Sequence, residues 1–292
     1  MKNNFNKGLI LTSLGSFWWG FIGVIYFESV SFIGHTELVV HRCLWTAIML
    51  IITTSFLSKW KIFFREIENK KKLIALLISG FLIFVNWSIW IYAVASERII
   101  DASFGYFIMP IISVLLGYIF FKEKLNKKRI FSIILVFISI MILIFFNLKS
   151  LPWVGLIVAF SWAFYNLVRK KIEIDTDIGL LIESLFIFPF ALFAFYIISK
   201  NGFNDFSFEK PALSLLLLLA GPMTVIPLFL YVRGVELIGL GPTGMIFYIT
   251  PTLQFILGYF YYDEDFSLVK FVSFIIIWIA VIIYLKDLYE TN

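Results

Sequence analysis

Residues 80–123 read GFLIFVNWSIWIYAVASERIIDASFGYFIMPIISVLLGYIFFKE, and residues 221–264 read GPMTVIPLFLYVRGVELIGLGPTGMIFYITPTLQFILGYFYYDE. The second stretch repeats the first at a constant offset of 141 positions, as the pair Pro110 and Pro251 shows (251 − 110 = 141). The chain is therefore an internal duplication. The same offset relates Gly80 to Gly221, Val94 to Val235, Leu116–Tyr118 to Leu257–Tyr259 and Glu123 to Glu264.

The loops that follow the two copies carry opposite charge. The first loop reads KEKLNKKR (Lys122–Arg129), whereas the second reads DEDFSLVK (Asp263–Lys270). Lys and Arg concentrate in the cytoplasmic loops of membrane proteins, so matching loops of opposite charge are expected on opposite sides. The two halves are therefore predicted to be inverted repeats, which are common among secondary transporters.

Composition places the chain in the membrane. The sequence has 292 residues, of which 61% are hydrophobic and 15% charged, with a mean hydropathy of +0.96. A helical span needs about 20 apolar residues, and the runs between charged clusters supply five spans in each half. We predict an all-α polytopic membrane protein with ten transmembrane helices in two inverted five-helix repeats, residues 1–147 and 148–292. The spans are roughly 8–29, 36–57, 73–95, 101–121, 130–147, 152–169, 178–199, 212–232, 239–262 and 268–285.

The distribution of basic residues predicts the orientation. With both termini in the cytoplasm, most Lys and Arg fall on the cytoplasmic side, and the opposite side keeps only Arg98, Lys149, Lys200, Lys210 and Lys270. The net charge of +5 therefore reflects topology, and no nucleic-acid partner is expected. The first apolar run is long, rich in Trp and continuous with the repeat, so it is predicted to be a span and not a cleaved signal peptide. The longest connection, Ser58–Lys72, is expected to form a short interfacial helix.

Residues for catalysis or cofactor binding are scarce. The chain has two histidines, His35 and His41, and one cysteine, Cys43, without metal-ligand spacing, a phosphate-binding Gly loop or a nucleophile elbow. We therefore expect no enzyme activity, no cofactor and no metal.

Ionisable residues inside the spans are expected to form two layers. Arg42 lies about six residues into the second span, roughly 9 Å deep, and Glu183 lies at a similar depth from the other surface. The two are then roughly 14 Å apart and are not expected to form a salt bridge. Charge at this depth is costly and usually functional, which suggests that the layers act as alternating gates. Charge at helix ends often snorkels to the surface, so ion pairs that only fix topology are an equal alternative. The outer layer comprises Glu28, His41, Arg42, Glu97 and Asp101, and the inner layer Arg169, Lys170, Glu183, Arg233 and Glu236.

A binding chamber is predicted between these layers. Pro110 and Pro251 each remove a backbone donor at mid-span, and the freed carbonyls are tolerated in lipid only where they face protein or a cavity. The alternative is ordinary helix kinking with aromatic packing. The candidate substrate-binding residues are Arg42, Asn86, Trp87, Trp90, Tyr106, Phe107, Tyr165, Tyr248 and Thr252, and the candidate gating or coupling residues are His41, Arg42, Glu183, Pro110 and Pro251.

Several motifs of the sequence stand out: His41–Arg42, Asn86–Trp87, ASFGYFIMP (Ala102–Pro110), FYNLVRKK (Phe164–Lys171), Ile182–Glu183, Thr224 with Ile226–Leu228, and YITPT (Tyr248–Thr252). Together they resemble the RarD-like branch of the EamA transporters, in the drug/metabolite transporter superfamily. The resemblance covers nearly the whole chain and implies ten helices, a central cavity, and movement of small metabolites or drugs across a bacterial inner membrane. Phe104, where most relatives are expected to have Leu, and the acidic DEDF sequence depart from the pattern.

The expected function is transport of a small organic solute by alternating access. Arg42 is suited to a carboxylate and Glu183 to an amino group, so an amino acid or related metabolite fits best. Protons are the candidate coupling ion through His41 or Glu183, and pH-independent uniport is the rival mechanism. A non-transporting sensor or scaffold is the alternative function. The sequence leaves the substrate, the direction of transport and the oligomeric state open, a homodimer included.

Overall fold

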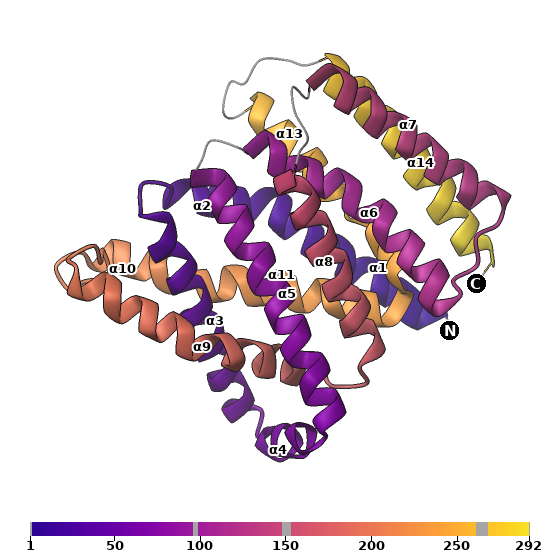
Figure 1. The fold of residues 1–292 in the computed structure, drawn as a ribbon. Coiled ribbons are helices and arrows are strands. Elements are labelled where there is room, and N and C mark those ends of the chain that lie inside the picture. Colours follow the sequence, from indigo (N-terminus) through magenta and orange to yellow (C-terminus); the bar gives the residue numbers. More distant parts are fainter. Residues whose placement is uncertain (1, 96–98, 148–152, 261–267, 292) are drawn as a thin grey trace.

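A computed structural model of the chain describes residues 2–95, 99–147, 153–260 and 268–291, and these are almost entirely helical (Figure 1). The first half contains α1 (Lys2–Phe17), the π-helix η1 (Trp18–Ile22), α2 (Gly23–Ser29), α3 (His35–Phe56), α4 (Trp60–Glu68), α5 (Lys70–Ala95), α6 (Ile99–Phe121) and α7 (Lys127–Asn147). The second half contains α8 (Trp153–Lys171), α9 (Thr176–Lys200), α10 (Pro211–Leu218), α11 (Ala220–Ile238), α12 (Leu240–Ile246), α13 (Ile249–Phe260) and α14 (Leu268–Thr291).

The helices combine into ten apolar segments over the described residues. The elements α1, η1 and α2 are continuous, one residue separates α10 from α11, and two separate α12 from α13. Counting these as single segments, and setting aside the short α4, leaves five segments in each half. Within the part of the chain that the structure describes, seven helical stretches are long and apolar enough to cross a membrane by length and composition. The predicted fold class is confirmed.

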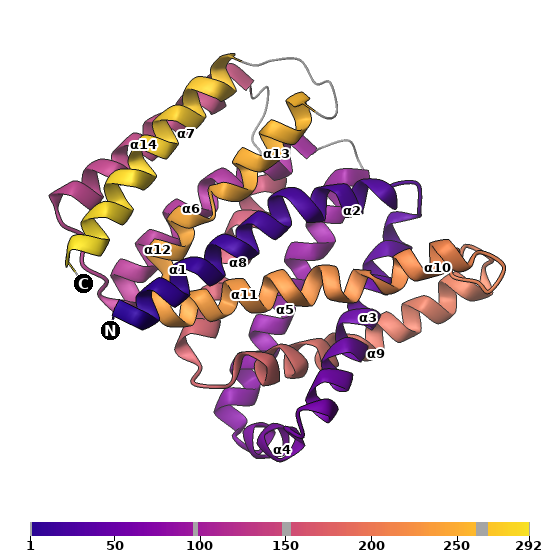
Figure 2. The ribbon, with the colours of Figure 1, turned by 180° about the vertical axis from the view of Figure 1, so that it is seen from behind.

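Helix packing follows the repeat. The contact of α1 with α11 corresponds to the contact between their repeat partners, α8 and α5. The contact of α13 with η1 corresponds in the same way to the contact of α6 with α8. The repeat-related pairs α3 with α9, α6 with α12, and α7 with α14 also pack together. In both views α7 and α14 run side by side at one edge of the bundle, and both chain termini lie at the same end (Figures 1 and 2).

The helix bundle has two opposite end faces. We call the face that carries both termini, α4 and the connections 122–126 and 172–175 the basic face (Figure 1). The opposite face carries the connections 30–34 and 201–210. The helix α4 lies within the connection for which the sequence predicted a short helix, and it carries both charged and aromatic residues.

Two regions of the backbone depart from regular α-helix. One is η1, which the sequence did not predict, and the other is the break at 247–248 between α12 and α13. Pro110 lies inside the continuous helix α6, whereas Pro251 lies in the first turn of α13. Backbone donors in a first turn lack intrahelical partners anyway, so Pro251 removes no bond from the helix interior. The two prolines therefore occupy different positions in their helices, and their gating role stays a prediction.

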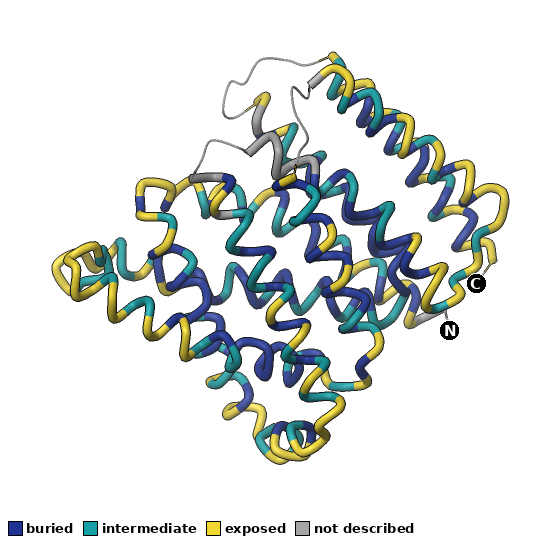
Figure 3. The backbone as a smooth tube through the Cα atoms, in the orientation of Figure 1, coloured by how far each residue is buried: buried dark blue, intermediate teal, exposed yellow. Residues whose placement is uncertain are grey.

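Buried apolar residues of the described helices form a main core, a second core and two smaller clusters. Figure 3 shows burial concentrated where the helices cross, with exposed residues toward the ends and rims. The main core includes residues of α3, α5, α8, α9 and α11, and the second core joins α6, α7, α12 and α14. Large apolar side chains on the outside, such as Phe145 and Phe190, give the bundle a surface suited to lipid.

Candidate functional site

The site is built first around Arg42, a buried cation on α3 that is only 7% exposed. Its Nε donates a hydrogen bond of 3.0 Å to Thr224 Oγ1 on α11. Its guanidinium carbon lies 4.5 Å from the ring centroid of Trp87 and 5.4 Å from that of Phe27. No carboxylate of a described residue pairs with Arg42. A guanidinium has five N–H donors, so most of them remain available to a ligand.

Two further aromatic residues complete this pocket. Tyr106 on α6 interacts electrostatically with Arg42, and a side-chain hydrogen bond connects Tyr106 with Trp90. The ring of Trp90 lies 5.3 Å from that of Phe27. Four predicted substrate-binding residues therefore come together here. We call Arg42, Phe27, Trp87, Trp90, Tyr106 and Thr224 the Arg42 pocket.

A second polar group surrounds Glu183 on α9. Arg169 Nε lies 3.5 Å from Glu183 Oε1, and both side chains are buried. Ser79 Oγ donates to Oε1 at 2.5 Å, and Tyr165 Oη donates to Oε2 at 3.2 Å. As expected from their depths, Glu183 and Arg42 do not pair with each other.

Glu236 extends this group toward the basic face. Arg169 Nη2 lies 3.7 Å from Glu236 Oε1, and Arg233 Nη1 lies 2.7 Å from Oε2. Lys170 Nζ donates to the Glu236 carbonyl oxygen at 2.6 Å, and Thr176 Oγ1 donates to Oε2 at 2.8 Å. The structure thus joins every residue assigned to the inner layer. We call Arg169, Lys170, Glu183, Arg233 and Glu236 the inner network.

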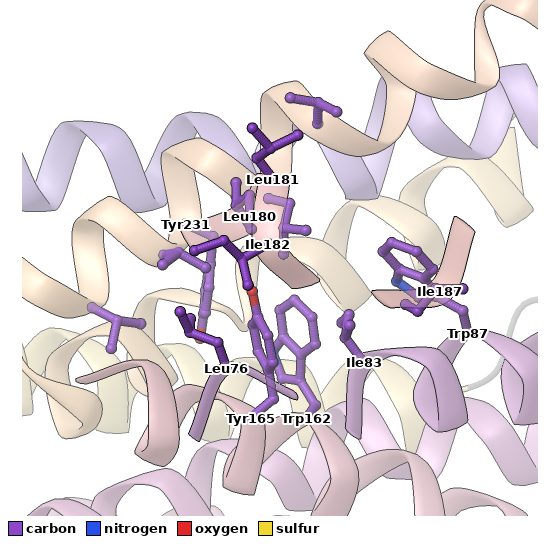
Figure 4. Close-up of a cluster of buried hydrophobic side chains, with 14 of the residues drawn as sticks. Leu76, Ile83, Trp87, Trp162, Tyr165, Leu180, Leu181, Ile182, Ile187 and Tyr231 are labelled. Carbon is purple, nitrogen blue, oxygen red and sulfur yellow. The ribbon is translucent and has the colours of Figure 1, made fainter. Parts of the chain in front are cut away.

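A small cavity lies between the Arg42 pocket and the inner network. Its lining includes Thr46, Trp87, Glu183 and Ser184, and the rest is apolar. Its volume is about 10 Å³, which is room for about one water molecule. Figure 4 shows Trp87, Ile83 and Ile187 on one side of this region, and Trp162 and Tyr165 next to them. The cavity between the two polar groups is therefore too small to hold an organic solute.

An aromatic cluster fills the centre of the bundle beside this cavity. Trp19 of η1 lies 5.2 Å from Trp162, and both contact Tyr231, each with a ring separation of 5.6 Å. Phe247, at the break before α13, lies 5.7 Å from its repeat partner Tyr106. Irregular backbone at membrane depth is tolerated where it is buried in protein or lines a cavity. Both irregular regions thus meet at the site, and Tyr231 is a member that sequence reasoning missed.

Some predicted binding residues make other contacts. Asn86 donates to the Val158 carbonyl oxygen at 2.9 Å and to Ser161 Oγ at 3.1 Å, both on α8. Its amide therefore joins two helices.

Three more of the predicted substrate-binding residues lie in or beside the second core. Tyr248 Oη donates to the Phe107 carbonyl oxygen at 2.8 Å, and Thr252 Oγ1 accepts a bond of 3.0 Å from Trp278 on α14. Phe107, Tyr248 and Thr252 thus belong to the contact with α14, and substrate binding by them stays a prediction.

The outer layer does not form one network among the described residues. His41 Nδ1 accepts a bond from Trp45 at 3.1 Å, and His41 Nε2 lies 3.4 Å from Glu37 Oε1. Glu37, which sequence reasoning missed, also accepts the backbone N–H of Asp205 at 2.7 Å. The sequence did contain a signal for this contact, because Glu37 and His41 are four residues apart and so lie on the same face of a helix. His41 thus faces the connection 201–210 while Arg42 faces the interior. Glu28 is exposed, and the side chains of Glu97 and Asp101 lie outside the described part of the chain.

Comparisons with known proteins agree with this architecture. The model of the EamA-like transporter family matches residues 6–145 and again residues 150–286. The uncharacterized transporter YojE of Bacillus subtilis is 34% identical over 281 residues, covering 95% of this chain and 93% of that protein. Protein RarD of Escherichia coli is 32% identical over 286 residues, covering 98% and 96%. A chloramphenicol-sensitive protein RarD of Pseudomonas aeruginosa is 25% identical and covers 85% and 83%.

A solved crystal structure extends the likeness to the fold. It superposes with a TM-score of 0.69 and covers 96% of this chain and 97% of that chain, at 11% sequence identity. The family and YojE are described as transporters, and the described helices are those of a multi-pass membrane protein. With the family model matched over both halves and full-length relatives above 30% identity, the chain belongs to the EamA-like transporter family.

Proposed function

We propose that the chain is a secondary transporter of a small organic solute with a carboxylate group, which Arg42 binds during alternating access. The buried guanidinium without a carboxylate partner among the described residues is the observation that carries this proposal. An uncompensated charge inside a membrane protein is costly and is usually retained for function. Arg is also suited to a carboxylate, because two of its N–H groups can bind both oxygens.

The surroundings of Arg42 suggest the rest of the solute. Trp87 and Trp90 offer aromatic surface, and the Tyr106 hydroxyl offers a hydrogen bond. Glu183 is engaged by Arg169, Ser79 and Tyr165, so we assign it to gating and not to an ammonium group of the solute. An organic anion with an apolar or aromatic body fits this pocket.

The inner network supplies the gate on the basic face in this proposal. Glu183 and Glu236 link α8, α9 and α11 through Arg169, and the cavity that Glu183 lines has room for about one water molecule. Solute could pass only if these helices separate, as alternating access requires. Protons remain the candidate coupling ion through Glu183 or His41. Flux that ignores a pH gradient and is unchanged in both Glu183→Gln and His41→Gln would favour uniport.

Counterflow in liposomes tests the proposal. Protein purified and reconstituted with one unlabelled carboxylate inside is offered labelled carboxylates and their neutral amide analogues. We expect saturable exchange of a carboxylate but not of its amide. Arg42→Ala should slow this exchange about 10-fold or more, because a hydrogen bond to a charged group contributes about 1.5–3 kcal/mol. Arg42→Lys should retain part of the activity.

Arg65→Ala is the matched control. Unlike Arg42, Arg65 pairs with a carboxylate, at 3.1 Å from Glu66 Oε1, and its side chain is 71% exposed on α4. Exchange by this variant should equal that of the parent protein. Exchange by Arg42→Ala at the rate of the parent protein would contradict the role of Arg42. Exchange of the amide analogues at the rate of the carboxylates would contradict it as well. A folded protein that exchanges no carboxylate would contradict the proposed substrate class.

A further inference from the structure

Glu123 joins the two halves of the molecule at the basic face. It follows α6, and its Oε1 accepts the backbone N–H of Leu240 at 2.8 Å. Its Oε2 accepts the backbone N–H of Gly241 at 2.9 Å. Leu240 and Gly241 open α12, the first part of the ninth segment. A side chain of the first repeat therefore holds a backbone corner of the second.

Local sequence builds the place for this carboxylate. Lys122 adopts a left-handed conformation, with φ of 53°, and the Glu123 N–H bonds to the Gly117 carbonyl oxygen at 3.1 Å. The chain thus turns back over α6. A Cβ added at Gly117 would lie 2.5 Å from Glu123 Oε2, and one added at Gly241 would lie 2.9 Å from the same atom. A Cβ at Gly239, where φ is 92°, would also meet the carboxylate. Glycines of both repeats therefore leave the space that Glu123 fills.

Charged and polar groups from other helices face the same carboxylate. Lys170 on α8 and Arg129 on α7 interact with it electrostatically, as does Tyr284 on α14. Burial raises the pKa of the Glu123 carboxyl, and the two N–H bonds and the two cations oppose that rise. Lys170 also donates to Glu236, so the contact adjoins the inner network.

We propose that Glu123 is a latch of the gate at the basic face. Its carboxylate ties the end of α6 to the start of α12 while this face is closed, and it releases both N–H groups when the face opens. This inference rests on alternating access from the proposed function, but it makes no use of Arg42 or of the solute. The repeat partner of Glu123, Glu264, lies outside the described residues.

Hydrogen exchange measured by mass spectrometry on the full chain in lipid nanodiscs tests the latch without substrate. The segment to follow is 239–246, with the parent protein compared with Glu123→Gln and Glu123→Asp. A Gln side chain has one acceptor oxygen, and its NH₂ group would oppose the second backbone N–H. An Asp side chain is too short to reach both groups. We expect exchange in this segment to be about tenfold faster in both variants.

Glu66→Gln is the control. Glu66 is also a carboxylate at the basic face, paired with Lys72 at 2.6 Å, but its side-chain partners belong to the first half. The Glu66→Gln substitution should leave hydrogen exchange in segment 239–246 unchanged. Segment 127–147 of α7 reports on the fold and should be unchanged in every variant. Exchange of 239–246 at the parent rate in Glu123→Gln would overturn the latch. Faster exchange in both segments would overturn it as well, because Glu123 would then support the fold and not one gate. If carboxylate counterflow failed but exchange in segment 239–246 was faster in the Glu123 variants, the proposed substrate would be wrong and the latch would still be supported.

Discussion

At the residue scale, two buried arginines have different surroundings. Arg169 is fully buried against Glu183 and Glu236. Arg42 has aromatic rings and one hydroxyl, without a described carboxylate partner. Breaking a buried ion pair is strongly destabilising, whereas an unpaired cation offers a site to an anion. The sequence identified both arginines as intramembrane charge, but their partners come from helices far away in the chain.

Gly179 provides a test of the Arg169 environment. A Cβ at this position would run into the Arg169 guanidinium, whose geometry is fixed by Glu183 and by the Thr176 carbonyl oxygen. We expect Gly179→Ala to lower the free energy of unfolding by about 1–3 kcal/mol, the usual cost of overpacking a core. Thermal unfolding in detergent micelles would measure the change.

Gly34→Ala is the control for this measurement. Gly34 precedes α3, and a Cβ there would have no neighbour within 4 Å. Its melting temperature should stay close to that of the parent protein. A Gly179→Ala variant as stable as Gly34→Ala would show that Arg169 can move aside at little cost.

At the element scale, equal sequence patterns produced unequal structures. Pro110 lies within a continuous helix, whereas its repeat partner Pro251 follows a break. The break at 247–248 and the π-helix η1 meet at the aromatic cluster, where Trp19 lies 6.1 Å from Phe247. Hydrophobic runs predicted that helices exist here, but neighbouring helices determine where each one bends.

The repeat-related glycines Gly80 and Gly221 give a quantitative test of this asymmetry. A Cβ at Gly221 would lie 2.6 Å from the Trp45 carbonyl oxygen, so α11 and α3 would have to move apart. A Cβ at Gly80 would lie 3.3 Å from Glu183 Cα, a tight but smaller encroachment. We expect Gly221→Ala to destabilise the protein by about 1–3 kcal/mol and Gly80→Ala by less. Paired melting curves in the same detergent would rank the two variants, and a reversed order would contradict the described crossings.

At the scale of the whole molecule, the arrangement of charge predicts the orientation in the membrane. Both termini lie at the basic face, together with α4 and the connection 122–126 (Figure 1). Because basic loops stay cytoplasmic, we expect both termini in the cytoplasm. Alkaline phosphatase fused to the C-terminus should be inactive, and a fluorescent protein fused there should be bright. The same phosphatase inserted after Gly202, in a connection of the opposite face, should be active. An active phosphatase at the C-terminus would reverse the assignment.

The sequence by itself determined the membrane class, the inverted duplication and the intramembrane charges at Arg42, Glu183 and the other inner residues. These features follow from hydrophobic length, loop charge and the cost of charge in lipid, which are properties of local sequence. Only the tertiary structure decided that Arg42 meets Trp87 and Thr224, that Asn86 joins helices, that Thr252 bonds to α14, and that Glu123 reaches α12. Those outcomes depend on helix rotation and crossing, which are set by side-chain packing between segments far apart in the chain, so one sequence pattern is compatible with several of them.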